Sequence, residues 1–528
     1  MSEQVKKSEI EKLKAEVERL KKELKKRKKY GLVWEEKPEE VVEMCKEKLP
    51  VLKEVKDKEI ITNKDKPVNL LIEGDNYHAL SVLNYTHAGK VDVIYIDPPY
   101  NTGNKDFIFN DHYIEREDAY RHSKWLSFME KRLKLAKNLL KDDGVIFISI
   151  DSIEFAQLKL LMDFIYGETN FINNIIWRKT NSPKAQTIGL GNQHEYVLMY
   201  AKNINKLVIN KKIGAINEKY LKMFSQDDKD GRGPYRTIEI EAHGIQKGKN
   251  RKEFVFRGRK APWLYSLETL EKWWREGRIY ISKTGRFRKK EYLNEMTGRL
   301  LSDLWIDEEI TPLQGGSKEY LNFPTQKPLS LMKRIIKLHP NKEGVILDFF
   351  AGSGSTGEAV LELNKEDNGN RKFILCTYNK ENNNGKIIDD YCYPRIKKAI
   401  LERSLGGNLK YFKTDFVDYD KPTDKNKIKL THRATEMLCI KEGTFDKVVD
   451  NEKFKIFKNS SHYTGIIWDQ TAIPEFKEAI KDVRGKFGVY VFSLGDETFD
   501  DEFTDLKQKV KLSPIPEAIL RVYRRIFK

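Results

Sequence analysis

The sequence has few cysteines, no long apolar run and no nucleotide-binding lysine loop. No two cysteines stand at the Cys-x-x-Cys spacing of zinc and redox sites, which argues against a metal site and against a disulfide framework. Reduced thiols, and the absence of an apolar run long enough to cross a membrane, favour a cytoplasmic protein. The four cysteines are Cys45, Cys376, Cys392 and Cys439.

Two further absences limit the enzyme classes. No glycine-rich loop continues into Gly-Lys-Ser or Gly-Lys-Thr, so a nucleoside triphosphate is not an expected ligand. No PD-(D/E)xK arrangement is recognisable, so a nuclease fused into this chain is not predicted. ATP-driven translocation and DNA cleavage would have to come from another polypeptide.

Positive charge, by contrast, is in excess. The 528 residues carry a net charge of +17, which favours a polyanionic partner, most often nucleic acid. The excess is strongest at residues 246–300, where 16 Lys/Arg stand against 6 Asp/Glu and aromatic residues are interleaved. Such a mixture suits contacts to phosphates and bases. The alternative is a solvated basic surface over a small aromatic core.

Strands alternate with helices on both sides of this basic stretch. Residues 69–80 are predicted to form a strand, a turn and a helix, and residues 91–97 and 145–151 are predicted to be buried strands. An amphipathic helix is expected between them, over 123–144 with Gly at its end. The pattern resumes at 344–364 and predicts an α/β fold with a doubly wound parallel sheet.

An acidic, proline-rich turn follows the strand at 91–96: Asp97-Pro98-Pro99-Tyr100. An acid held by two prolines is a preorganised acceptor for the amino group of a base, whose lone pair is delocalised into the ring. Hydrogen bonds from that group to Asp97 and to the Pro98 carbonyl would return the lone pair to nitrogen, and Tyr100 would stack on the base. The alternative is a strand-ending turn with a solvent-exposed acid.

A glycine-rich turn, Ala351 to Gly357, follows a second strand that ends at Asp348. Glycines allow backbone N–H groups to approach a ligand closely at the start of a helix. Nucleoside cofactors bind in this way at the carboxyl edge of a parallel sheet, where Asp97 is also expected to lie.

These two motifs resemble an amino-group DNA methyltransferase of the β class, which uses S-adenosylmethionine. In that class Asp/Ser-Pro-Pro-Tyr precedes Phe-x-Gly-x-Gly, as residues 97–100 precede residues 350–354 here. The resemblance implies a Rossmann-like sheet and transfer of a methyl group to a flipped base. Asp rather than Ser favours N6 of adenine over N4 of cytosine. The implied catalytic residues are Asp97, Pro98, Pro99 and Tyr100.

The resemblance also implies a set of cofactor-binding residues. The segment at 323–328 resembles the one that contacts the methionine moiety, and Asp75 corresponds to a residue beside the adenine. The strand after the glycine turn departs from the family, because Asn379 or Glu381 stands where an acid usually binds the ribose. The implied residues are Asp75, Thr325, Gln326, Lys327, Asp348, Phe349, Phe350, Ala351, Gly352, Ser353, Gly354, Thr356 and Asn379.

Further segments, among them residues 97–103 and 512–528, resemble the modification subunit of type III restriction-modification systems. This implies double-stranded DNA as substrate, a homodimer and a separate restriction subunit carrying helicase and nuclease. The implied domains are a helical arm at 1–45, a catalytic part at 46–203, a target-recognition domain at 204–322, a cofactor part at 323–410, and a C-terminal α+β domain at 411–528 for assembly or partner contacts.

Three alternatives stay open. The chain could be a solitary adenine methyltransferase without a restriction partner, or a cytosine-N4 or RNA enzyme. It could also be mainly a sequence-reading subunit with a vestigial site, although both motifs are intact. The helical arm carries an apolar seam that fits either a dimer contact or docking on its own domain. Its residues are Ile10, Leu13, Val17, Leu20 and Leu24.

Overall fold

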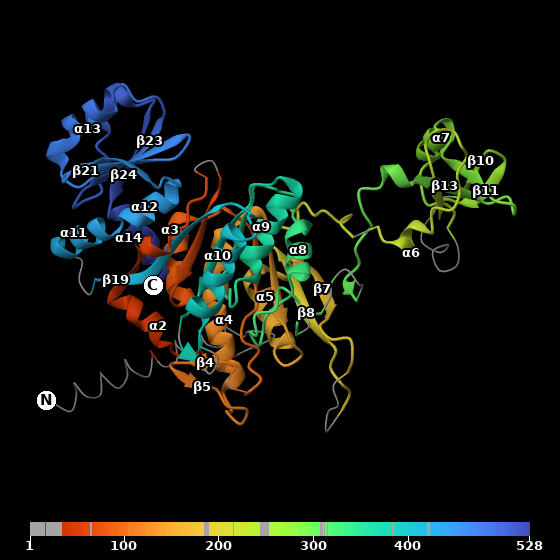
Figure 1. The fold of residues 1–528 in the computed structure, drawn as a ribbon, viewed down its shortest axis with the longest axis horizontal. Coiled ribbons are helices and arrows are strands. Elements are labelled where there is room, and N and C mark those ends of the chain that lie inside the picture. The colour runs from red at the N-terminus through yellow and green to blue at the C-terminus, as the bar shows by residue number, and fades with distance from the viewer. Residues whose placement is uncertain are drawn as a thin grey trace. The chain divides into compact units, whose positions relative to one another are not determined.

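The structure is a computed structural model of the chain. It describes residues 16, 34–63, 66–104, 106–183, 189–214, 216–242, 253–306, 310, 312–313, 315–379, 381–382, 385–419 and 423–527. The five apolar residues of the predicted seam lie outside these ranges. The chain forms two compact units, one of Met1–Ile209 with Asp303–Lys528 and one of Asn210–Ser302, coloured yellow-green in Figure 1. The second unit lies within the predicted segment 204–322 and is shorter at both ends.

The first unit is built on a ten-stranded sheet. Adjacent strands of this sheet are parallel from β19 to β6, whereas β8 is antiparallel to both β6 and β7. The predicted doubly wound parallel sheet is therefore confirmed. In spatial order the strands are β1 (Lys48–Glu54), β19 (Asn408–Asp418), β2 (Val68–Glu73), β16 (Lys372–Thr377), β15 (Val345–Asp348), β3 (Val91–Ile96), β6 (Leu140–Ile150), β8 (His194–Ala201), β7 (Phe171–Arg178) and β14 (Leu304–Trp305).

Helices pack in two groups against this sheet. One group is α3 (Asn76–Thr86), α4 (Arg121–Leu139) and α5 (Phe155–Tyr166), and the other is α8 (Leu329–Leu338), α9 (Ser355–Asp367) and α10 (Tyr393–Leu401). Right-handed crossovers that run in opposite directions along the sheet place the two groups on opposite faces. The mainly apolar pattern of the central strands follows from this cover, since β3 is buried at every position, Asp92 included.

Helix α4 ends five residues before the predicted glycine stop. It closes at Leu139, and the next residues already belong to β6, where Leu140 pairs with Val91 of β3. The predicted helix over 123–144 is wrong at this end, because pairing with β3 outcompetes the local stop signal. Shorter elements are α2 (Glu40–Glu43) and the hairpins β4 (Ile108–Phe109) with β5 (His112–Tyr113) and β17 (Glu381–Asn382) with β18 (Gly385–Lys386).

The C-terminal part carries its own five-stranded sheet, drawn in blue in Figure 1. Helices α12 and α14 pack on α3 of the main sheet. Ten of the eleven residues of α3 are consequently buried, so this helix is internal. The elements are α11 (Asp424–Arg433), α12 (Thr435–Glu442), β20 (Asp446–Asp450), β21 (Phe454–Lys458), β22 (His462–Ile467), α13 (Ile473–Ile480), β23 (Lys486–Phe492), β24 (Val510–Ile515) and α14 (Glu517–Ile526).

The second unit is a small body of antiparallel strands and short helices with an aromatic core. Phe256, Trp263 and Phe287 are buried together around Leu270. Many of its basic residues therefore surround an aromatic core. This agrees with the small aromatic core of the alternative interpretation, in which the basic stretch is a solvated surface. Its elements are α6 (Glu218–Leu221), β9 (Tyr235–Glu239), β10 (Glu253–Phe256), β11 (Arg259–Pro262), α7 (Leu267–Arg275), β12 (Ile279–Ile281) and β13 (Phe287–Tyr292). In the described part of the whole chain, no helix is both long and apolar enough to cross a membrane.

Candidate functional site

The two predicted motifs lie at the ends of neighbouring strands. Strand β3, which precedes Asp97, pairs in parallel with β15, which ends at Asp348. After β3 the chain continues to β6 on one side, and after β15 it continues to β16 on the other. Strand order reverses between them, and this is the position at which open α/β sheets bind their ligands. The predicted proximity of the two motifs is confirmed.

The Asp97 carboxylate is held on both oxygens. The Tyr100 hydroxyl donates to Oδ1 at 2.7 Å, and Lys327 Nζ lies 3.0 Å from Oδ2. The proline turn between them is anchored by Trp125 of α4, whose Nε1 donates to the Pro99 carbonyl at 2.7 Å. The Asp97 side chain is only 15% exposed, so the structure contradicts the alternative of a solvent-exposed acid.

Glu195, from β8, completes this cluster and was not predicted. Its Oε2 accepts a hydrogen bond from Lys327 Nζ at 3.1 Å and lies 3.2 Å from the Tyr100 hydroxyl oxygen, whose single proton is donated to Asp97. Its Oε1 lies 3.2 Å from Lys179 Nζ. The only sequence signal is an acid just before the apolar run of β8. Lys327, predicted to contact the cofactor, thus lies at the turn of residues 97–100, between two carboxylates.

The pKa values of the two acids are shifted in opposite directions, because Glu195 contacts Lys179 as well as the Lys327 that it shares with Asp97. Burial raises the pKa of Asp97, and the nearby Lys327 offsets this only in part. Burial also acts on Glu195, but Lys327 together with Lys179 holds the pKa of Glu195 below its usual range. Burial lowers the pKa of Lys327, yet the two carboxylates outweigh it and raise that pKa overall. Asp97 is thus the stronger proton acceptor of the two acids.

The glycine loop is closed by its own residues. Asp348 Oδ1 accepts from the backbone N–H of Phe350 at 3.0 Å, and Oδ2 accepts from the Thr356 hydroxyl at 2.6 Å. Burial raises the pKa of Asp348 to about 7. Gly352 and Gly354 have φ of +49° and +80°, in the left-handed region that favours glycine. Asp348 and Thr356 therefore shape the loop rather than point out of it.

The other predicted loop residues are buried or partly buried. Phe349 is fully buried, Ala351 is buried and its N–H donates to the Cys376 carbonyl at 3.1 Å, and Phe350 packs partly buried against the core. The Ser353 hydroxyl accepts from Arg395 Nη1 at 3.2 Å.

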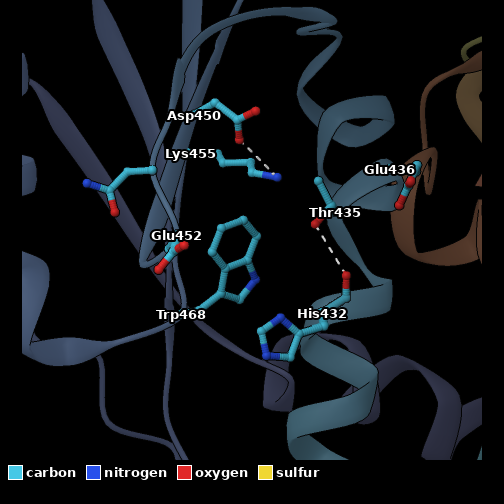
Figure 2. Close-up of a pocket in the computed structure, with 8 residues that line it drawn as sticks. His432, Thr435, Glu436, Asp450, Glu452, Lys455 and Trp468 are labelled. Carbon is cyan, nitrogen blue, oxygen red and sulfur yellow. Dashed lines mark hydrogen bonds and ion pairs between the residues drawn. The ribbon is translucent and has the colours of Figure 1, made fainter.

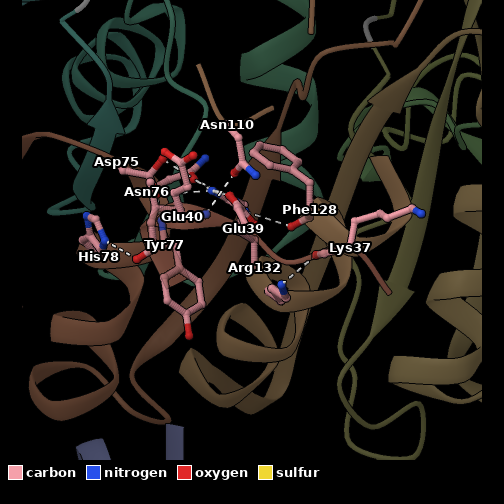
Figure 3. Close-up of polar contacts among 12 residues, drawn as sticks. Lys37, Glu39, Glu40, Asp75, Asn76, Tyr77, His78, Asn110, Phe128 and Arg132 are labelled. Carbon is pink, nitrogen blue, oxygen red and sulfur yellow. Dashed lines mark hydrogen bonds and ion pairs between the residues drawn. The ribbon is translucent and has the colours of Figure 1, made fainter. Parts of the chain in front are cut away.

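Asp75 lies beside the same loop in a network centred on a buried arginine (Figure 3). It caps α3 by accepting from the Tyr77 N–H at 2.7 Å, and Arg132 Nη2 lies 3.3 Å from its Oδ1. Arg132 also binds both Glu39 oxygens, at 2.7 and 3.0 Å. Asn76 Nδ2 donates to the Phe349 carbonyl at 3.0 Å. The network ties the segment before α2 and the start of α3 to the glycine loop.

The remaining predicted residues differ in their surroundings. Thr325 is exposed, whereas Gln326 braces its own loop, donating to the Glu319 carbonyl at 2.6 Å and accepting from the Leu321 N–H at 3.0 Å. Asn379, after β16, donates to Asp389 Oδ2 at 2.9 Å and accepts from the Ile388 N–H at 3.0 Å. Its amide is thus engaged within the chain. The Glu381 side chain lies outside the described structure.

A pocket of about 590 Å³ in the C-terminal part lies apart from these residues (Figure 2). The rings of His432 and Trp468 stack in it, with centroids 5.8 Å apart, and Lys455 pairs with Asp450 at 3.1 Å. Glu436 also lines it. None of the predicted site residues does.

A doubly wound sheet with an acidic proline turn and a glycine loop at its switch point defines a class of nucleoside-binding transferases. A family model described as DNA methylase matches residues 91–388, more than half of the chain. The chain belongs to this DNA methylase family.

Individual proteins are similar to this chain over part of its length. The type III restriction-modification enzyme StyLTI Mod subunit of Salmonella typhimurium is 34% identical over 63% of this chain, which spans 56% of that protein. The type II methyltransferase M.KpnI of Klebsiella pneumoniae is 31% identical over 66% of this chain and 88% of its own length. The crystal structure of an M1.HpyAVI–SAM complex has a TM-score of 0.31 at 17% identity, covering 63% of this chain and 99% of that one.

Proposed function

We propose that this chain transfers a methyl group from S-adenosylmethionine to N6 of an adenine flipped out of double-stranded DNA. One observation carries the proposal: in a member of the DNA methylase family, Asp97-Pro98-Pro99-Tyr100 and the glycine loop lie at the ends of two paired strands. A methyl donor in the loop and an amino group at Asp97 would be neighbours there.

The glycine loop fits the cofactor. No described side chain caps the first turn of α9, so its backbone N–H groups are available to an anionic group such as the methionine carboxylate. A Cβ on Gly354 would come within 3.0 Å of Cys392 Sγ, so glycine permits the close approach of loop and α10. Residues 351–354 and Asp75 would hold the cofactor. When bound, it supplies an electrophilic methyl group.

Asp97 and the Pro98 carbonyl would accept the two hydrogens of the adenine amino group. The buried Asp97 carboxylate, with its raised pKa, is a stronger acceptor than an exposed one and is able to take the proton that the amine must lose. Asp97 Oδ2 now accepts from Lys327, which would move toward Glu195 when the base enters. Tyr100 is held by its hydroxyl, which orients its ring for stacking on the base.

Recognition of the DNA sequence is assigned to the insert at 204–322, and chiefly to the unit Asn210–Ser302. Its local excess of Lys and Arg suits phosphate contacts, and its exposed arginines suit base contacts. Exchange of this insert with that of a relative should change the methylated sequence. An unchanged sequence would place recognition elsewhere.

As a second part of the proposal, the chain is the modification subunit of a type III restriction-modification system in the cytoplasm. The similarity to a Mod subunit supports this, and so does the C-terminal part, which carries none of the proposed site residues. We expect a homodimer that recruits a separate restriction subunit. The alternative is a solitary adenine or N4-cytosine methyltransferase, because the chain is also similar to M.KpnI, which is named as a type II methyltransferase and not as a Mod subunit.

The decisive experiment is methyl transfer from labelled S-adenosylmethionine to plasmid DNA, followed by digestion to nucleosides. Label in N6-methyladenine supports the proposal, label in N4-methylcytosine supports the alternative, and no label contradicts both. Light scattering with and without cognate DNA tests the dimer, which a monomer at micromolar concentration would contradict. Co-expression with the neighbouring reading frame tests the restriction partner.

A further inference from the structure

A buried polar cluster adjoins the catalytic turn without belonging to it. Asn101 follows Tyr100 directly, is fully buried and has a φ of +58°. Its Nδ2 donates to Glu154 Oε1 at 2.5 Å and to the Arg121 carbonyl at 3.2 Å. The Glu154 side chain, just before α5, is 0% exposed. A buried acid therefore holds the residue that directly follows the catalytic turn.

Two atoms of this contact lack hydrogen-bond donors among the described residues: Asn101 Oδ1 and Glu154 Oε2. An unpaired buried acceptor costs about 1–3 kcal/mol. Asn101 Oδ1 belongs to the amide group, and Glu154 Oε2 to the carboxyl group, that the hydrogen bond from Asn101 Nδ2 to Glu154 Oε1 already joins. A proton on Glu154 Oε2 would turn one acceptor into a donor for the other. The amide and the acid would then form a cyclic pair with two hydrogen bonds.

His122 of α4 has the protonation state that such a pair requires. Its Nε2 accepts from Arg121 Nε at 3.2 Å, and an arginine N–H always donates, so Nε2 carries no proton. The proton is then on Nδ1, which lies 2.6 Å from Glu154 Oε1 and donates to it. Burial, with the adjacent Arg121, lowers the pKa of His122. The imidazole is therefore neutral and provides no charge to keep Glu154 ionised.

Burial leaves Glu154 protonated at neutral pH. Burial raises the pKa of Glu154 to about 8. The hydrogen bond from Asn101 and the charge of Arg121 act in the opposite direction, and Asp151 at the end of β6 adds to the rise. Since this carboxyl binds its proton more tightly when folded, the stability linked to Glu154 falls as the pH rises from about 4.5 to about 8.

We propose that Glu154 is a positioning residue for the catalytic turn, which it holds through a cyclic acid–amide pair with Asn101 in which Glu154 carries the proton. Asn101 is joined to Tyr100, so the pair determines where the Tyr100 ring and Asp97 lie. Loss of the proton breaks one of the two bonds and leaves an ionised carboxylate in the core. The link to catalysis rests on the proposed function, whereas the proton on Glu154 does not.

The variant E154Q separates this proposal from a purely structural role. Glutamine reproduces the protonated acid, because its amide donates to Asn101 Oδ1 and its oxygen accepts from Asn101 and His122. E154Q should keep single-turnover methyl transfer within about twofold at pH 7, whereas E154A should lose more than about tenfold. Between pH 7 and 9.5 the wild type should slow by about tenfold or more, and E154Q should not. The exposed Glu168 provides the control E168Q, which should follow the wild type.

Loss of activity in E154Q comparable to that of E154A would overturn the proposal, and so would failure of E154Q to fold. A direct readout is the infrared difference spectrum of wild type minus E154Q at pH 6.5. It should contain the carbonyl band of a protonated carboxyl group, which disappears on titration through the pKa of about 8. Absence of the band overturns the pair. Presence of the band in a protein that methylates no DNA keeps the pair and defeats the proposed function.

Discussion

The glycine loop after β15 and the catalytic turn after β3 lie at neighbouring strand ends, but different contacts hold them. In the glycine loop, Asp348 is bonded to Thr356, eight positions away. In the catalytic turn, the Tyr100 hydroxyl contacts Glu195 and Lys327, which are 95 and 227 positions away. The Asp348–Thr356 bond is thus local, although more distant residues also contact the loop, whereas these contacts of Tyr100 form only when the whole sheet has folded.

The largest expected effect is in the turn assembled over long range. D97A removes the proposed acceptor of the amino group and should lower methyl transfer by about 10²–10³-fold or more, while DNA binding stays close to wild type. The measurement is single-turnover transfer of labelled methyl groups. Asp142, whose side chain is 61% exposed, gives the control D142A. Normal turnover in purified D97A would remove Asp97 from catalysis.

The second effect concerns stability. K327M leaves Asp97 and Glu195 without their shared cation, and these side chains are only 15% and 9% exposed. Removing one partner of such a buried cluster should lower the free energy of unfolding by about 3 kcal/mol. Urea denaturation measures it. In α8, which begins two residues after Lys327, K337M removes a surface lysine that is 39% exposed and should cost less than about 1 kcal/mol. Equal losses of unfolding free energy in K327M and K337M would contradict the inference that long-range contacts hold the turn at 97–100.

A third variant tests the local turn. G354V places a side chain at a φ of +80°, within 3.0 Å of Cys392 Sγ. Binding of S-adenosylmethionine, measured by calorimetry, should weaken by at least about tenfold, and G352V should act in the same direction. G89V is the matched control, because Gly89 also has positive φ but open space around it. Unchanged affinity in G354V would place the cofactor elsewhere.

The smallest effect is expected for T356A. It removes the hydroxyl that donates to Asp348 Oδ2, and the lost hydrogen bond should cost about 1–2 kcal/mol of unfolding free energy. The catalytic turn does not depend on this contact, so methyl transfer at saturating cofactor should change little. Thermal unfolding and single-turnover rates check the two statements. A loss of rate as large as that of D97A would show that the two turns are coupled.

Sequence patterns predicted much of the fold and the composition of both motifs. Buried β-branched runs identified β3 and β15, and alternation with helices predicted the parallel sheet, because such strands must be covered on both faces. The helix over 123–144 shows the limit: a local stop at Gly144 was predicted, but pairing of Leu140 with Val91 ends the helix at Leu139. A strand partner distant in sequence leaves no local signal.

The sequence by itself determined the internal contacts of the glycine loop, because positive-φ glycines, a strand-ending acid and a threonine on the following helix act within one short segment. Only the tertiary structure decided the surroundings of Asp97. It placed Lys327 between Asp97 and Glu195, and it buried Glu154 against Asn101. The physical reason is that the charge state of a buried acid depends on which distant groups share its low-dielectric surroundings, and the order of residues along the chain does not specify those neighbours.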